Sequence, residues 1–142
     1  MTAVDALQTA LAAEHAAVYV YGALGARTSE SASPVLFAEV ADAYRTHRAW
    51  RDLLVRRLAD AGAQPTPAAA IYELPPPTPT AAAVARAALD LELACARTYA
   101  YVVAETVDED RRWALTALTR TAVRETALGG APAVFPGADD LG

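Results

Sequence analysis

Apolar side chains recur every three or four positions along four segments of the chain, and no segment alternates as a strand would. This spacing predicts four amphipathic helices, at residues 3–26, 34–61, 80–107 and 108–128. Thr2 and Asp5 have the spacing of a capping box before the first helix. Ser33 and Pro34 are typical of the start of the second helix, and Gly62 is typical of its end. We therefore expect an all-α protein.

The connection between the second and third helices, residues 62–79, is rich in proline. Its prolines are Pro65, Pro67, Pro75, Pro76, Pro77 and Pro79. An extended chain of this kind rises about 3.1 Å per residue and a helix only about 1.5 Å, so the connection can run the length of a helical bundle. We therefore predict a single four-helix bundle over residues 1–129, with residues 62–79 as a crossover. Residues 130–142 are expected to be a C-terminal coil.

Polar side chains interrupt the apolar faces of the predicted helices near their middles. Glu14, His47 and Glu92 each stand where the spacing favours an apolar residue. Two faces of the fourth helix compete for the core. One is Leu115, Leu118, Ala122 and Glu125, and the other is Ala117, Thr121, Arg124 and Leu128.

A shift of 78 residues brings the two halves of the chain into partial register, which indicates a weak internal repeat. The shift places Glu14 on Glu92 and Tyr21 on Tyr99. Alanine-rich helices match one another by chance, so the agreement between the two glutamates is the stronger sign of a repeat.

Folding each half into an antiparallel hairpin brings the polar positions to one level. A turn near residues 30–31 sets Glu14 opposite His47. A turn near residue 108 sets Glu92 opposite Arg124 or Glu125. We therefore predict a polar layer in the middle of the bundle, formed by Glu14, Tyr44, His47, Glu92 and Glu125. Buried charges must be paired, hydrogen-bonded, neutralised or bound to a metal.

Three interpretations of this layer are open. In the first, it holds one iron, manganese or zinc ion, which carboxylate and imidazole ligands suit. The ligands would be Glu14, His47, Glu92 and Glu125. In the second, it holds no cofactor, Tyr44 donates a hydrogen bond, and Arg48, Arg51 and Arg124 neutralise the acids. In the third, the register is wrong by one residue and some of these groups face solvent.

Composition and charge exclude several other classes of protein. The chain has 142 residues, a formal net charge of −5 and a single cysteine, Cys95. These values argue against a disulfide framework, a multi-cysteine zinc site and a nucleic-acid binder. No apolar run reaches about 18 residues, and residues 1–11 lack a basic segment, so we expect no membrane helix, no signal peptide and a cytoplasmic location. The 37 alanines and the 12 basic residues, all arginine, indicate a GC-rich genome rather than a function.

Other chemistry-bearing residues have structural interpretations. We expect His15 at a helix boundary or surface, and Cys95 as a small core residue. Ile71, Tyr72 and Leu74 of the crossover are expected to cover the core rather than dock a partner. The chain shows no nucleophile paired with a base and no glycine-rich phosphate loop, which argues against a hydrolase or a nucleotide enzyme.

The layout of four helices, with a long crossover between the second and the third, resembles the ferritin-like superfamily. In its di-iron members, the first and third helices each supply a glutamate, and the second and fourth each supply a Glu-x-x-His pair. Glu14, Glu92 and His47 match this pattern. Tyr44 and Ala122 stand where the bridging glutamates belong. The resemblance therefore implies a ferritin-like four-helix bundle with a degenerate di-metal centre.

Short motifs make the chain similar to a group of alanine-rich ferritin-like proteins from GC-rich bacteria. They are Glu14-His15-Ala16-Ala17 with Tyr21-Gly22, and His47-Arg48 with Arg51-Asp52-x-Leu54. The function of that group is uncharacterised, so the similarity implies a fold and little else. We expect a homodimer with a structural or partner-binding role. The alternative is a metal-binding oxidoreductase that uses the reduced Glu/His site in the core.

Overall fold

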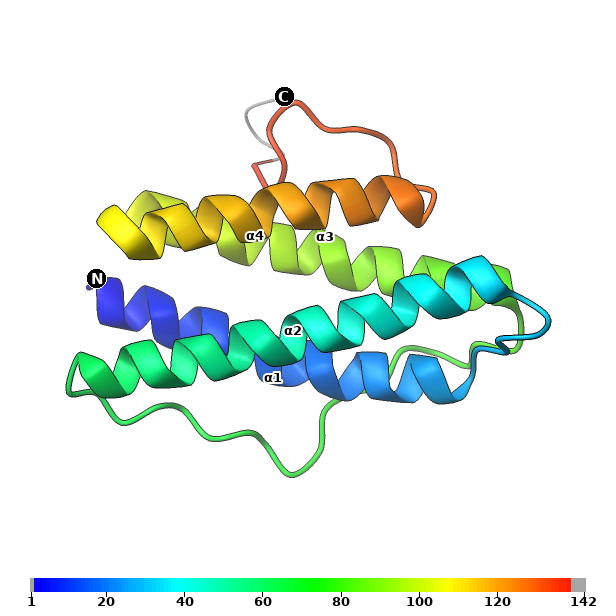
Figure 1. Ribbon diagram of the computed structural model, residues 1–142, viewed down its shortest axis with the longest axis horizontal. Helices are drawn as coiled ribbons and strands as arrows, with labels where there is room; N and C mark the ends of the chain where they lie inside the picture. The colour runs from blue at the N-terminus through cyan, green and yellow to red at the C-terminus, as the bar shows by residue number, and fades with distance from the viewer. Residues whose placement is uncertain (1, 139–142) are drawn as a thin grey trace.

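Four long helices make up most of the structure, a computed structural model that describes residues 2–138 (Figure 1). They are α1 (Ala3–Ala26), α2 (Pro34–Asp60), α3 (Ala81–Glu105) and α4 (Asp108–Ala127). Residues 2–138 contain no strand, so the predicted all-α four-helix bundle is confirmed, with helix ends within two residues of those expected. None of these helices is long and apolar enough to cross a membrane.

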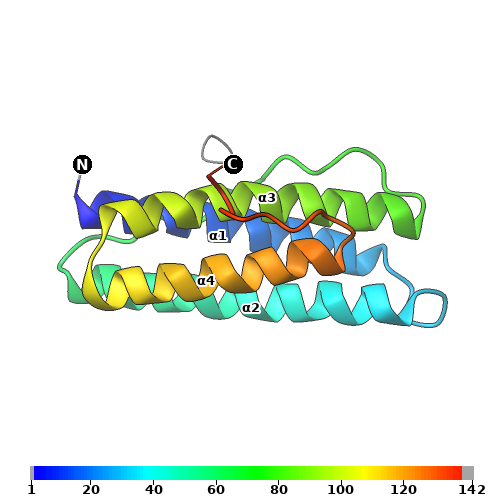
Figure 2. The same ribbon diagram turned by 90° about the horizontal axis from the view of Figure 1, so that it is seen from above.

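The helices lie along a common axis in an order set by the crossover (Figures 1 and 2). α1 and α2 form one antiparallel hairpin, and α3 and α4 form the other. Residues 61–80, here called the strap, run back along the bundle, so α3 starts at the end where α1 finishes. α1 therefore lies antiparallel to α3 and packs against both α2 and α3.

Local sequence signals account for the ends of the helices. The capping box forms: the Thr2 backbone N–H donates to Asp5, and the Asp5 N–H donates to the Thr2 hydroxyl. Gly62, just after α2, has a φ of 75°, a left-handed conformation that favours glycine. The α3–α4 turn instead places Asp108 at a φ of 51°, a region in which aspartate is enriched among non-glycine residues.

The strap is fastened to α1 over much of its length. Gln8 donates to the carbonyl of Gln64 (2.7 Å) and accepts from the Thr66 N–H (2.8 Å). A ring nitrogen of His15 lies 3.0 Å from the Thr66 carbonyl, so this half-buried histidine anchors the strap. The strap's Ile71, by contrast, is 77% exposed and covers no core.

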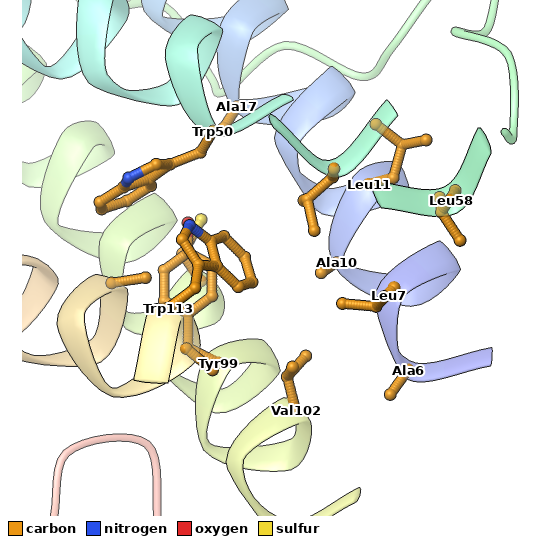
Figure 3. Packing of buried hydrophobic residues seen from close by; sticks show 14 residues of the cluster. Ala6, Leu7, Ala10, Leu11, Ala17, Trp50, Leu58, Tyr99, Val102 and Trp113 are labelled. Carbon is orange, nitrogen blue, oxygen red and sulfur yellow. The ribbon is translucent and has the colours of Figure 1, made fainter. Parts of the chain in front are cut away.

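Two apolar clusters form the core. His47, Glu92 and Glu125 each lie between residues of the first cluster and residues of the second along their helices, and Glu14 lies within the α1 part of the first cluster. The first cluster contains Leu11, Trp50, Tyr99 and Trp113 (Figure 3). The second contains Val20, Leu24, Val40, Val84 and Leu89.

α4 buries the second of its two competing faces. Ala117, Thr121, Arg124 and Leu128 are buried, whereas Leu115 is 46% exposed. Glu125 is buried as well, so α4 contributes two charged residues to the middle of the bundle. Beyond α4, residues 130–138 form no helix, as expected, and residues 139–142 lie outside the described part.

Candidate functional site

His47 lies at the centre of a buried hydrogen-bond network. Its Nδ1 is 2.6 Å from Oε2 of Glu14, and its Nε2 is 3.1 Å from Oε1 of Glu92. All three side chains are at most 1% exposed. Burial lowers the pKa of His47, but the carboxylates of Glu14 and Glu92 outweigh it and raise the pKa to about 9. The ring is therefore an imidazolium at neutral pH and donates from both nitrogens.

Two buried tyrosines also donate hydrogen bonds to the carboxylates of Glu14 and Glu92. The Tyr21 hydroxyl donates to Oε1 of Glu92 at 2.6 Å, and the Tyr99 hydroxyl donates to Oε1 of Glu14. Burial and the neighbouring carboxylates raise the pKa of both phenols, so both stay protonated and act as donors. The resulting chain of hydrogen bonds runs from Tyr99 through Glu14, His47 and Glu92 to Tyr21.

The two tyrosine–glutamate pairs are crossed between the halves of the chain. Each tyrosine follows its own helix's glutamate by seven positions, but it donates to the glutamate of the other helix. This exchange is the symmetry expected if α1 and α3 are equivalent members of the repeat. It also links α1 to α3 through charged groups rather than through apolar packing alone.

Arg124 connects the network with the surface of the bundle. Its Nε lies 3.5 Å from Oε1 of Glu92. Its other nitrogens donate to Glu39 (2.6 Å) and Asp42 (2.9 Å) at the edge of α2. Hydrogen bonding to this guanidinium lowers the pKa of Asp42. Burial raises the pKa of Glu92, but bonds to His47 and Tyr21 and the charge of Arg124 lower it overall, so Glu92 stays ionised.

Three residues predicted for the polar layer or its neutralisation lie elsewhere. Tyr44 is half-buried at the edge of α2, because it stands about 60° around the helix from His47. Arg48 is exposed, and its guanidinium lies over the Tyr44 ring, 5.5 Å from the ring centroid. Arg51 is 27% exposed and pairs with the neighbouring Asp52. The predictions that Tyr44 and Arg51 belong to the buried layer, and that Arg48 neutralises it, are therefore wrong.

Two tryptophans form one wall of the network, and the sequence analysis missed both. The Trp50 ring meets the rings of His47 and Tyr99 edge-on, and its centroid lies 5.5 Å from the centroid of each. Trp113 of α4 packs edge-on against Tyr99 at 5.8 Å (Figure 3). The sequence did contain a signal for Trp50, because it follows His47 by three residues, nearly one helical turn, and so lies beside it on the helix. Their rings fill the space between α2 and α4 and screen the network from water.

The residues that meet here do not fit a di-metal centre. At the two positions where the ferritin-like resemblance implies bridging glutamates, the chain has Tyr44 and Ala122 instead of carboxylates. A metal would need a lone pair on His47, and both of its ring nitrogens already face carboxylates. Within residues 2–138, no three His, Cys, Asp or Glu side chains are arranged to hold a metal ion. Glu125, the fourth predicted ligand, is buried on α4.

Comparison with known proteins places the chain in a family. Residues 6–140 match the family described as a domain of unknown function, DUF4439. A crystal structure of a conserved hypothetical protein, rv2844, from Mycobacterium tuberculosis superposes with a TM-score of 0.80 at 38% sequence identity, over 89% of this chain and 95% of the other. No curated protein sequence matched. The chain thus belongs to the DUF4439 family.

Proposed function

We propose that this protein is a ferritin-like bundle in which a hydrogen-bonded imidazolium stands in place of the di-metal centre, and that its role is structural or partner-binding. The ferritin-like part of the proposal is supported by the helix order and by the strap between α2 and α3. Glu14 on α1, His47 on α2 and Glu92 on α3 occupy positions that supply metal ligands in that superfamily.

One observation carries the proposal: both ring nitrogens of His47 face carboxylates, at 2.6 and 3.1 Å. The imidazolium gives these acids the positive charge that a metal ion would otherwise provide. Arg124 supplies a second cation, 3.5 Å from Glu92. Two side-chain cations thus lie beside Glu14 and Glu92 and offset their negative charges, which is how the proposal accounts for buried carboxylates without a metal.

Exposed apolar side chains support a partner-binding role. On the outer side of α4, Val123 is 67% exposed, and Leu115 on the same helix is also exposed. Val134 and Phe135 are exposed in the segment that follows α4. We propose a second copy of the chain as the first partner to test, because alanine-rich helices offer flat surfaces to one another.

A metal-binding oxidoreductase is the second candidate, with Glu14, His47, Glu92 and Glu125 as ligands. The observation in its favour is that Oε2 of Glu92 is buried and makes no hydrogen bond within the described residues. An unsatisfied carboxylate oxygen in a core is costly and is a natural ligand for a cation.

Metal content distinguishes the two candidates. The protein is purified without chelators, incubated with ferrous, manganous or zinc salts at pH 7, desalted and subjected to elemental analysis. We expect background metal in the wild type and in the His47→Ala variant. About one metal per chain that is lost in His47→Ala would overturn the proposal in favour of the oxidoreductase. Two metals per chain would contradict the interpretation of Tyr44 and Ala122.

A further inference from the structure

The second half of the strap, residues 71–80, lies outside the four helices and arches away from them before it joins α3 (Figure 2). The first half is fastened to α1 by hydrogen bonds, but residues 71–79 make no backbone–backbone hydrogen bond within residues 2–138. Ile71 is 77% exposed and Leu74 is 37% exposed. This half of the strap therefore presents apolar side chains to solvent.

Proline restricts the backbone of this segment. Each proline holds φ at about −65° and has no N–H to donate. A residue that precedes a proline, as Leu74 and Thr78 do, is restricted to extended backbone as well. The chain bends at Pro76 but forms no helix or strand in residues 71–79. Residues 74–79 are therefore held in extended backbone of the polyproline II type, which has three residues per turn. The prolines are Pro75, Pro76, Pro77 and Pro79.

Exposure along the segment follows the same period of three. Tyr72, Pro75 and Thr78 are half-buried. The ring of Tyr72 packs against Tyr19 of α1, with 5.5 Å between the ring centroids. One edge of the segment thus rests on the bundle, and the other two edges face solvent. The residues on these two edges form three exposed pairs, which are Glu73-Leu74, Pro76-Pro77 and Pro79-Thr80.

Two exposed edges that carry proline suit one mode of recognition by proteins. Grooves lined by aromatic side chains bind proline-rich segments with P-x-x-P spacing, because the polyproline helix is already formed. Pro76 and Pro79 have this spacing, and both are exposed. The stiffness of the segment also means that little conformational entropy is lost on binding.

An arginine beside the segment indicates the charge of the partner. Arg27, at the end of α1, lines a groove of about 410 Å³ together with Thr78 and three of the prolines. It donates to the Thr78 hydroxyl at 3.3 Å, and no carboxylate within residues 2–138 lies within ion-pair distance of it. We propose that residues 73–80 bind a protein domain in a groove of aromatic side chains, with an acidic side chain of that domain against Arg27. This proposal rests on the partner-binding part of the proposed function and names the kind of partner.

The probes are an SH3 domain and a WW domain, two folds that bind proline-rich segments in grooves lined by aromatic side chains. Each domain is titrated into the 15N-labelled chain, and binding is followed by amide chemical shifts. We expect saturable binding of at least one domain, with shift changes centred on Arg27 and on the non-proline residues of the segment 71–80.

Alanine at single prolines tests which edges are contacted. Pro76→Ala and Pro79→Ala should each weaken binding about tenfold, because each removes an exposed ring. Pro75→Ala removes the same ring from the edge that faces the bundle. It should weaken binding about threefold or less, since only the fixed φ is lost. Pro67→Ala, in the half of the strap that is fastened to α1, should leave binding unchanged.

The arginine is tested with a matched pair of variants. Arg27→Gln should weaken binding roughly threefold, whereas Arg56→Gln, at an exposed position of α2, should leave it unchanged. Equal effects of these two variants would refute the acidic group in the partner. Circular dichroism should show the same helix content in every variant.

Three results would overturn the binding segment itself. They are the absence of saturable binding for both domains, shift changes confined to residues outside 71–80, and equal losses for the exposed and the half-buried prolines. Shift changes in the segment on dilution without a probe would assign it instead to a second copy of the chain. Elemental analysis of the core is a separate measurement, so a failure of this proposal and a failure of the proposed function are distinguishable.

Discussion

The raised pKa of His47 predicts that the protein loses stability as the pH rises from neutral. The folded pKa is about 9, above the unperturbed value of 6.5. A group whose pKa is raised by folding binds its proton more tightly in the native state. Its contribution to stability is therefore fully present below about pH 6.5 and is lost as the pH rises through about 9.

The magnitude follows from the difference between the two pKa values. One pKa unit corresponds to about 1.4 kcal/mol, so a difference of about 2.5 units corresponds to roughly 3 kcal/mol of unfolding free energy. Nearly all of this loss falls between pH 6 and 9.5. Measurements should stop there, because the raised pKa values of Tyr21 and Tyr99 destabilise the native state further once unfolded tyrosines ionise. Burial also raises the pKa of the Cys95 thiol, so the slope assigned to His47 is the slope below about pH 8, where an unfolded thiol is still mostly protonated.

The assay is urea unfolding followed by tryptophan fluorescence and circular dichroism, at constant ionic strength from pH 6 to 9.5. His15→Gln removes the other histidine and should keep the full slope. His47→Gln should flatten it. If His47→Gln does not fold, the wild type and His15→Gln still decide the matter. A wild-type stability that is flat or rises over this range would refute the assignment of an imidazolium to the core.

Three further predictions concern single side chains. Tyr99→Phe removes a donor to a buried carboxylate and should lower the unfolding free energy by about 1–3 kcal/mol; Tyr19→Phe, at the surface, should change it by less than about 0.5 kcal/mol, and equal effects would contradict the network. Arg124→Gln leaves Glu92 with one cation fewer and should cost about 3 kcal/mol in the same assay; a loss no larger than that of a surface variant would show that Arg124 does not stabilise the core. Val123→Glu should convert a dimer to a monomer in light scattering, and a wild type of monomer mass would contradict the homodimer.

Spacing along the helices was sufficient to find the three central residues of the site. Glu14, His47 and Glu92 occupy positions where the spacing favours apolar residues. An antiparallel hairpin that turns near residues 30–31 places Glu14 opposite His47. The same reasoning failed for Tyr44. That residue shares the apolar stripe of His47 but lies at its edge, and the width of the buried face depends on how closely α1 approaches α2.

The spacing of residues along a helix does not show which side chains donate hydrogen bonds to the buried carboxylates. Tyr21 and Tyr99 were expected in the core, yet which glutamate each one reaches is fixed by the antiparallel arrangement of α1 and α3. Which face of α4 is buried was also visible only in the tertiary structure. Its most apolar face is not the buried one, because Arg124 is stabilised by acids on α2.

The crossed tyrosine–glutamate pairs bear on how such a chain could have arisen. Each central glutamate accepts a hydrogen bond from a phenol in the other half of the chain. Two identical hairpins, related by a two-fold axis across the bundle, would satisfy the same requirement by exchanging phenols. The architecture is therefore what gene duplication and fusion of a two-helix ancestor would leave behind. On this view the strap would join the two former hairpins, and His47, which the 78-residue shift places on Glu125, would be a position at which the two halves differ.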